Sequence, residues 1–190
     1  MNLKKASEIA DKIIDLYREH GGEEYSGEKV TQLEHMAQAA ELATKQGYDD
    51  EIVLAAFLHD IGHICVSASQ NTEMGGYGIM DHEEVGASFL REQGFSKRVA
   101  RLVESHVEAK RYLTYKDQEY FDRLSDASRK TLEYQGGKMT EEEASAFEHY
   151  PMFELIIKMR KWDEEAKVQH LSLPDLEHYR NLIIKHLENQ

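Results

Sequence analysis

Histidine and aspartate residues recur along this chain in an order that suits a metal centre. The adjacent pair His59-Asp60 lies in the apolar segment AAFLHDIGH, where burying an unpaired carboxylate would be costly without a cation to neutralise it. His35 precedes His59, and His106 follows His82, each by about one helix and one connection, and Asp163 lies late in the chain. Helical bundles build dinuclear centres from side chains on several helices in this way. The predicted metal ligands are His35, His59, Asp60, His82, His106 and Asp163.

The ligand types indicate which metals this centre would take. Asp60 is the predicted bridge between two ions, because one carboxylate oxygen can bind each ion. His63 lies one helical turn after His59 and is expected to point at whatever the metals bind. Imidazole and carboxylate without thiolate suit Fe, Mn, Co, Ni or Zn. For a lone His-Asp pair, a hydrogen-bonded core histidine is the commoner explanation, but six matching positions favour the metal site.

Two cationic residues lie close in sequence to predicted ligands. Lys110 follows His106 by one turn, and Arg160 precedes Asp163 by three residues, so each can share a helix face with a ligand. Together with His63 they predict a pocket for an anion. The alternative for both cations is a surface salt bridge.

Neutral polar residues could complete this pocket. Ser128, Thr131 and Gln135 have the spacing i, i+3 and i+7, which forms one polar stripe on a short helix. We expect these side chains to contact the substrate, and the alternative is a solvated face.

Two glycine-rich loops lie next to predicted ligands. Residues 21–28 place Tyr25 and Glu28 just before the helix that carries His35. Residues 66–80 form a longer loop between two sets of predicted ligands. Long loops in compact domains are often lids or binding loops, and the alternative for both is an ordinary surface connection.

The elements that must position these residues are helices. The chain has only two prolines, and no stretch shows the sustained alternation of a β-strand, so the predicted fold is all-α. Helices are expected at residues 3–20, 29–46, 50–63, 82–93, 96–110, 118–124, 127–134, 141–149, 152–166 and 174–188.

Capping residues support several of these boundaries. Asp81 and Thr140 each precede an acid by three residues, which predicts N-caps. Gly47 and Gly94 suit helix C-termini.

Length and charge limit the possible classes of protein. With 190 residues and 41% hydrophobic content, residues 1–190 are expected to form a single domain. The formal charge of −13 argues against a nucleic-acid partner, which would require a basic face. No apolar run approaches a membrane span, and the single cysteine, Cys65, fits a reducing compartment. We therefore expect a cytoplasmic protein without a membrane partner.

The order H…HD…H…H…D resembles the HD-domain superfamily. The form with four histidines and two aspartates is similar to its mixed-valence di-iron oxygenases, and above all to those that act on phosphonates. The resemblance covers nearly the whole chain and is carried by the strings YSGE, QLEH, AAFLHDIGH, EMGGYG, HEEVGA, SHVEAKRYL, LSDASRKTLEYQGG, WDEEAK and EHYR. It implies an HD-domain helical bundle with a dinuclear metal site in its core.

The resemblance also implies roles for individual residues. His35, His59 and Asp163 would hold one iron ion, His82 and His106 the other, and Asp60 would bridge the two. Tyr25 would guard the substrate-binding iron and move aside with Glu28 when substrate arrives. The implied catalytic residues are Tyr25, Glu28 and His63, and the implied substrate-binding residues are these three with Lys110, Ser128, Thr131, Gln135 and Arg160.

The implied reaction is oxidative C–P bond cleavage of a small zwitterionic phosphonate, with a mixed-valence Fe(II)/Fe(III) pair and O2 as co-substrate. The expected substrate is 2-amino-1-hydroxyethylphosphonate, which would give glycine and inorganic phosphate after a 2-oxoglutarate-dependent hydroxylase has acted. The N-trimethylated substrate, which would give glycine betaine, is equally compatible with these motifs. A metal-dependent HD phosphohydrolase and an HD fold used only for binding are the competing classes.

Overall fold

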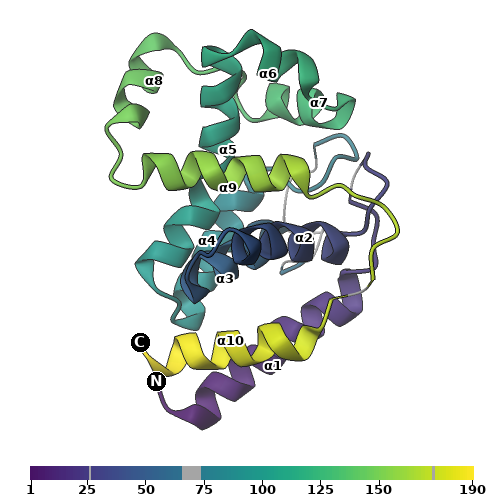
Figure 1. Cartoon of the computed structure of the whole chain (residues 1–190), viewed down its shortest axis with the longest axis vertical. Coiled ribbons are helices and arrows are strands. Elements are labelled where there is room, and N and C mark those ends of the chain that lie inside the picture. The colour runs from purple at the N-terminus through teal and green to yellow at the C-terminus, as the bar shows by residue number, and fades with distance from the viewer. Residues whose placement is uncertain (26, 66–73, 173) are drawn as a thin grey trace.

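The computed structural model describes residues 1–25, 27–65, 74–172 and 174–190 (Figure 1). In these ranges the chain forms helices and no β-strand, which confirms the all-α prediction. No helix in them has the length and apolar character needed to cross a membrane. The helices are α1 (Leu3–His20), α2 (Gln32–Lys45), α3 (Asp50–Leu58), the 3-10 helix η1 (Ile61–His63), α4 (His82–Gln93), α5 (Lys97–Lys116), α6 (Gln118–Arg123), α7 (Asp126–Tyr134), α8 (Glu141–Glu148), α9 (Phe153–Glu165) and α10 (Leu176–Glu188).

Most predicted helices lie within a few residues of the observed ones, but α5 continues to Lys116, beyond the predicted end at residue 110, and the expected helix at 50–63 is wrong. Helix α3 ends at Leu58, and the backbone leaves the helical conformation at Asp60, with φ −105° and ψ 15°. The chain continues as the short η1. His59 and Asp60 therefore lie in a turn, and His63 does not follow His59 on one continuous helix face. Much of the predicted loop at 66–80 lies outside the described residues.

The predicted helix caps have mixed outcomes. Thr140 forms the expected capping box at the start of α8. Gly94 ends α4 with φ 90°, and Gly47 follows α2 with φ 77°, both in the left-handed region that favours glycine. The prediction for Asp81 is wrong: its backbone is left-handed, with φ 56°, and its side chain makes no capping hydrogen bond.

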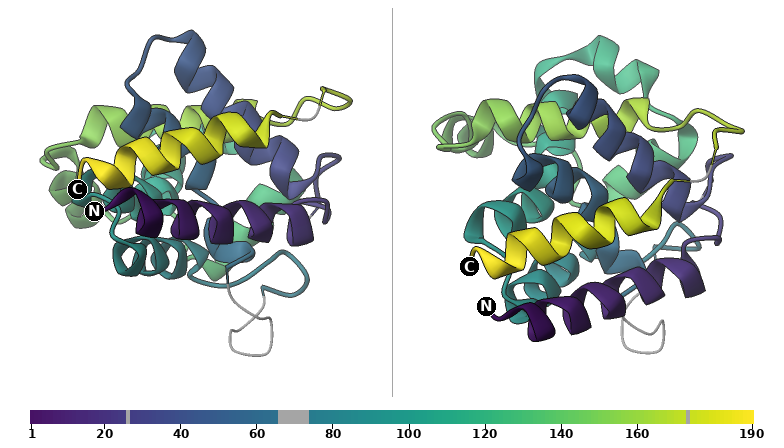
Figure 2. Two further views of the ribbon diagram at one scale, coloured as in Figure 1. Left: turned by 90° about the horizontal axis from the view of Figure 1, so that it is seen from below. Right: turned by 60° about the horizontal axis from the view of Figure 1, so that its bottom comes forward.

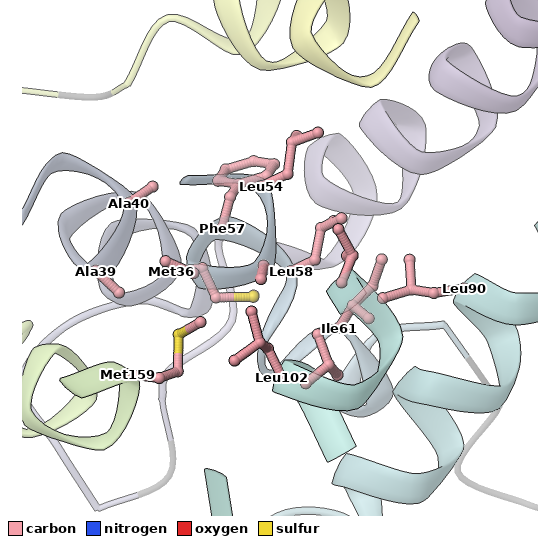
Figure 3. Close-up of a cluster of buried hydrophobic side chains, with 14 of the residues drawn as sticks. Met36, Ala39, Ala40, Leu54, Phe57, Leu58, Ile61, Leu90, Leu102 and Met159 are labelled. Atoms are coloured by element: carbon pink, nitrogen blue, oxygen red, sulfur yellow. The ribbon is translucent and has the colours of Figure 1, made fainter. Parts of the chain in front are cut away.

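A hydrophobic core fills the space between the central helices. Met36 from α2, Phe57 and Leu58 from α3, Leu102 from α5 and Met159 from α9 converge there with almost no exposed surface (Figure 3). Burial of such apolar surface is the main source of free energy for folding. This packing also fixes the spacing of α2, α5 and α9, which each carry one predicted ligand, and of α3, which leads into the turn that carries two.

Outer helices cover two sides of this core. Helices α1 and α10 lie side by side along one side, with the two chain ends close together (Figure 2). The amino group of Met1 lies 3.5 Å from the carbonyl oxygen of Glu188. Helices α6, α7 and α8 lie on the opposite side, beyond α9 (Figure 1). The site residues lie between these layers.

We predict that Gly62→Ala destabilises the protein. A Cβ atom at Gly62 would lie 1.9 Å from the backbone oxygen of His82, so η1 and α4 would have to separate. We expect a loss of about 3 kcal/mol in the free energy of unfolding, the upper end of ordinary overpacking costs, measured by urea denaturation. In the control Gly22→Ala, the added Cβ meets no atom within 4 Å. Equal unfolding midpoints for the two variants would contradict this prediction.

Candidate metal centre and active site

The structure brings all six predicted ligands into one buried cluster. His35 comes from α2, His106 from α5 and Asp163 from α9, and each is at most 2% exposed. The other three follow the end of α3 or begin α4. The capping box of Thr31 and Glu34 fixes the start of α2 one turn before His35.

One half of the cluster consists of His35, His59 and Asp163. The two Nε2 atoms of His35 and His59 lie 3.1 Å apart. The Oδ1 atom of Asp163 lies 3.4 Å from His35 Nε2. These three residues offer donor atoms close enough together to hold one ion.

The other half pairs His82 with His106, and Asp60 lies between the halves. The Nε2 atoms of His82 and His106 are 3.0 Å apart, and each lies 3.2 Å from Asp60 Oδ1. The second oxygen, Oδ2, faces the first half at 3.5 Å from His35 and 3.3 Å from His59. Asp60 therefore directs one oxygen toward each pair of imidazoles, which is the arrangement of a bridging carboxylate.

The hydrogen bonds of the histidines leave their Nε2 lone pairs facing one another. In each ring, Nδ1 lies within hydrogen-bonding distance of a backbone carbonyl oxygen, which assigns the proton of the neutral ring to Nδ1. Metal-binding histidines are typically oriented by such bonds. The carbonyl partners of His35, His59, His82 and His106 are Ala166 at 2.9 Å, Ala56 at 2.8 Å, Ile79 at 3.3 Å and Val103 at 2.7 Å, respectively.

These lone pairs and the adjacent carboxylates fit a pair of metal ions. Two bare nitrogens about 3 Å apart repel each other unless a cation binds both. Nitrogen ligands at right angles on an ion, with bonds of about 2.1 Å, would lie about 3.0 Å apart. Asp60 Oδ2 and Asp163 Oδ1 are also buried without a hydrogen-bond partner. The donor set therefore fits two ions of the kind that imidazole and carboxylate prefer.

The acid–base properties of the cluster show the same demand for positive charge. Burial alone would raise the pKa of Asp60, but the surrounding histidines, His59 foremost, hold it well below the usual value. Burial alone would lower the pKa of His35, but the carboxylates of Asp163 and Asp60 raise it to about 9. The cluster therefore attracts a cation, which a proton on His35 or a metal ion could supply.

His63 lies against this cluster, but its hydrogen bonding differs from that of the four histidines. Its ring stacks on His82 with centroids 4.1 Å apart, and its Nδ1 accepts the backbone N–H of Ile79 at 3.1 Å. Burial and the neighbouring His82 hold its pKa well below the usual value, so the ring is neutral. With Nδ1 an acceptor, the proton lies on Nε2. Although His63 is close enough to Asp60 and His82 to be counted as a ligand, this tautomer makes it a hydrogen-bond donor.

A cavity of about 40 Å³ opens beside the cluster. Its wall includes the metal-facing residues Asp60, His82, His106 and Asp163. Every residue predicted to contact substrate also lines it, namely Tyr25, Glu28, His63, Lys110, Ser128, Thr131, Gln135 and Arg160.

Lys110 is a buried amine with neutral partners. Its side chain comes from α5 and donates to Thr131 Oγ1 at 2.6 Å and to Gln135 Oε1 at 2.8 Å. Among the described residues it forms no ion pair, and burial, with Arg160 nearby, holds its pKa well below the usual value. The predicted polar stripe therefore faces Lys110 and not solvent. An anion in the cavity would stabilise the charged form of this amine.

Arg160 is held by contacts on several sides. It pairs with the ligand-cluster residue Asp163 and with Glu164, and its Nε donates to the hydroxyl of Tyr120 at 2.9 Å. The side chain is 4% exposed and lines the cavity. Arg160 therefore does not form the surface salt bridge considered as its alternative. It belongs to a buried network that orients both its guanidinium group and Asp163.

Tyr25 and Glu28 close one side of the cavity. The ring of Tyr25 stacks on His35, with centroids 3.9 Å apart and an interplanar angle of 15°. Burial and the negative charge of Asp60 raise the pKa of Tyr25 well above its usual value, so its hydroxyl is protonated. Glu28 accepts hydrogen bonds from Ser125 at 2.6 Å and from Lys167 at 2.9 Å.

Several residues around the cavity were missed by sequence reasoning. Gln32, Tyr77 and Val107 line the wall, and Lys167 pairs with Glu28. Val107 follows His106 directly and Lys167 lies one turn beyond Asp163, so proximity to a ligand was an available signal. Tyr77 lies in the glycine-rich loop at 66–80, whose position between predicted ligands was the available signal, but the sequence did not single out this residue.

The family model for the HD domain matches residues 32–147. This match covers more than half of the chain, from the start of α2 to near the end of α8, and includes all the predicted ligands except Asp163. The chain belongs to the HD-domain family.

Its relatives define the class more narrowly. A [1-hydroxy-2-(trimethylamino)ethyl]phosphonate dioxygenase (glycine-betaine-forming) of Leisingera caerulea is 41% identical over 180 residues, covering 92% of this chain and 88% of the relative. A hydroxymethylphosphonate dioxygenase of Gimesia maris is 39% identical over 188 residues, covering 98% of this chain and 92% of the relative. An uncharacterized protein of Acanthamoeba polyphaga mimivirus is 45% identical over 186 residues, covering 98% of this chain and 85% of the relative.

This protein is accordingly an HD-domain dioxygenase, as the sequence motifs predicted. A metal cofactor, which is iron in this family, follows from that membership and agrees with the histidine and aspartate cluster. Neither relative with a named activity is a hydrolase or a protein used only for binding, so those two alternatives lose their support.

We predict that Asp60→Ala abolishes binding of both metal ions, because this carboxylate faces both halves of the cluster. Metal content after iron loading, measured by mass spectrometry, should be two ions per chain for the unmodified protein and below one for the variant. His178→Ala, which alters an exposed histidine, is the control and should retain two ions. Circular dichroism would verify that each variant is folded, and a folded Asp60→Ala protein with two ions would disprove the bridging role.

Proposed function

We propose that this protein uses O2 to cleave the carbon–phosphorus bond of a small 1-hydroxyalkylphosphonate. In its specific form, the substrate is 2-amino-1-hydroxyethylphosphonate and the products are glycine and inorganic phosphate. The N-trimethyl analogue, which would give glycine betaine, is the alternative suggested by the Leisingera relative. The nitrogen-free hydroxymethylphosphonate is suggested by the Gimesia relative.

The observation that carries this proposal is the position of Lys110. A buried amine with neutral partners opens onto the same cavity as the histidine and aspartate cluster. Arg160 lines this cavity as well. A phosphonate dianion bound between Lys110 and Arg160 would supply the missing negative charge. Its hydroxyl-bearing carbon would then lie next to the ligand cluster.

The proposed ligands divide as the geometry suggests. His35, His59 and Asp163 would hold one iron ion, His82 and His106 would hold the other, and Asp60 would contribute to both. When bound, a mixed-valence Fe(II)/Fe(III) pair would supply a Lewis acid for the substrate hydroxyl and the one-electron chemistry that O2 requires. The four backbone carbonyls behind the histidines keep each Nε2 lone pair directed at its ion.

The remaining residues bind and orient the substrate. His63 donates its Nε2–H to a phosphonate oxygen, since its Nδ1 is already an acceptor. Thr131 contacts Lys110, Ser128 precedes Thr131 by three residues on α7, and both side chains line the cavity and add hydroxyl groups to it. Fixed donors of this kind select the dianion over a neutral molecule. Substrate-binding roles for all of these residues are part of the proposal.

Tyr25 must move for substrate to bind. The cavity of about 40 Å³ has room for only a few water molecules, since about 10–15 Å³ of such volume holds one. Tyr25 covers His35 at the edge of this cavity. Displacement of its ring would enlarge the cavity on the side of the metal-facing residues. In the closed position the same ring limits access of water to the cluster.

The proposed reaction balances without a further co-reactant. The C–P bond of the substrate breaks, and both oxygen atoms of O2 enter the products, one on carbon and one on phosphorus. The carbinol carbon is oxidised to a carboxylate as O2 is reduced. The substrate must itself be supplied by hydroxylation next to phosphorus, for which we propose a 2-oxoglutarate-dependent hydroxylase. We place this pathway in the cytoplasm, where the thiol of Cys65 would remain reduced.

We predict that the iron-loaded protein releases inorganic phosphate from 2-amino-1-hydroxyethylphosphonate only when O2 is present. Phosphate is measured colorimetrically under air and under argon, with the N-trimethyl analogue and hydroxymethylphosphonate tested in parallel. Release from at least one substrate, absent under argon, supports the oxygenase proposal. Equal phosphate release under air and argon, or release from phosphate esters alone, would contradict the oxygenase proposal and favour a hydrolase.

We also predict that Lys110→Met lowers kcat/KM for phosphonate cleavage on the order of 100-fold, because removing one partner of a buried charge pair is costly. The matched control is Lys97→Met, which removes an exposed lysine from the same helix. Lys110→Arg should recover part of the activity. Full activity in a folded Lys110→Met protein would remove the main support for an anion at this position.

A further inference from the structure

Glu28, which lines the cavity, is already neutralised by another side chain. Its Oε1 accepts from Lys167 Nζ at 2.9 Å and from Ser125 Oγ at 2.6 Å. The side chains of Lys167 and Glu28 are only 17% and 14% exposed, so solvent screens this ion pair weakly. Lys167 itself does not line the cavity, so it can affect a substrate through Glu28.

Lys167 is held firmly on both sides. The carbonyl oxygen of the preceding residue, Ala166, accepts the hydrogen bond of His35 Nδ1 at 2.9 Å. The following residue, Val168, exchanges two hydrogen bonds with the side chain of Gln38, at 2.9 and 3.0 Å. Residues 166–168 therefore form a fixed segment that joins a ligand-cluster histidine to the partner of Glu28.

Glu28 in turn lies in the same connection between α1 and α2 as Tyr25, here called the Tyr25–Glu28 loop. The backbone N–H of Glu28 donates to the carbonyl oxygen of Tyr25 at 2.8 Å, and the N–H of Tyr25 donates to the carbonyl oxygen of Val30 at 2.9 Å. A force on the Glu28 carboxylate is thus transmitted to the backbone that carries the Tyr25 ring. The ion pair with Lys167 fastens this loop over the ligand cluster.

We propose that Lys167 is a positioning residue that both fastens the Tyr25–Glu28 loop and sets the selectivity of the site for the substituent of the hydroxyalkylphosphonate. This inference rests on the proposed function, because it assumes a substrate of that class. Glu28 acts directly on the substrate end opposite the phosphonate. Lys167 acts through Glu28 by cancelling its charge.

The selectivity follows from competition for one carboxylate. A substrate ammonium group that approaches Glu28 must compete with the Lys167 ammonium, whereas a hydroxyalkylphosphonate without nitrogen meets no such competitor. Removing the Lys167 charge would therefore favour aminated over nitrogen-free substrates. It would also loosen the loop, because Glu28 would lose its charged anchor, and of its side-chain partners among the described residues Ser125 would remain. These two consequences can be measured independently.

The selectivity test compares the unmodified enzyme with Lys167→Met, Lys167→Arg and the control Lys161→Met, which removes an exposed lysine from α9. The kcat/KM for phosphate release is measured on 2-amino-1-hydroxyethylphosphonate and on 1-hydroxyethylphosphonate. In Lys167→Met, the ratio of the two should rise on the order of tenfold, a coupling within reach of one half-buried charge pair. Lys167→Arg and Lys161→Met should leave the ratio unchanged. A ratio unaltered in Lys167→Met would overturn the selectivity role.

The loop test does not depend on turnover. Amide hydrogen exchange at Tyr25 and Glu28 should be faster in Lys167→Met than in the unmodified protein, with exchange in the core of α5 unaltered. Equal exchange in the two proteins would overturn the fastening role. If no phosphonate releases phosphate with the unmodified enzyme, the proposed function fails by itself, and the exchange experiment still decides whether Lys167 fastens the loop.

Discussion

The structure depends above all on the buried carboxylate of Asp60. Its two oxygens face two pairs of imidazoles whose Nε2 atoms lie 3.0 and 3.1 Å apart. Such a concentration of lone pairs is stable only with compensating positive charge. Four helices and one turn must converge to build it, so the hydrophobic packing of α2, α3, α5 and α9 serves to hold this charged cluster in place.

The part of the fold that follows from local pattern could be predicted from the sequence. The helices predicted at residues 3–20 and 82–93 match the observed bounds of α1 and α4. The metal site was predicted from an aspartate placed in an apolar run. The break of α3 at Leu58 could not be predicted, since AAFLHDIGH has the composition of a continuous helix. Asp60 leaves the helix because its two oxygens must reach both imidazole pairs and because Gly62 packs on the backbone of His82, and both are tertiary constraints.

The tautomer of His63 and the partner of Glu28 also could not be predicted from the sequence. His63 was predicted near the metals from its spacing, but its role as a donor depends on the backbone N–H of Ile79. Glu28 was expected to bind substrate, and the structure places Lys167 against its carboxylate. In both cases the decisive partner comes from a distant segment. Side-chain chemistry can be read from a sequence, but the state of a group depends on its neighbours in space.

The distribution of hydrogen bonds separates metal binding from substrate choice. The ligand histidines are oriented by backbone carbonyls, three of them one turn before the ligand and one, Ala166, at the end of α9. Those bonds do not depend on side-chain identity. The contacts of Glu28, by contrast, are with the side chains of Ser125 and Lys167. A change at either residue would alter the cavity without displacing a carbonyl behind a ligand, so this architecture allows one metal centre to serve hydroxyalkylphosphonates that differ only in their substituent.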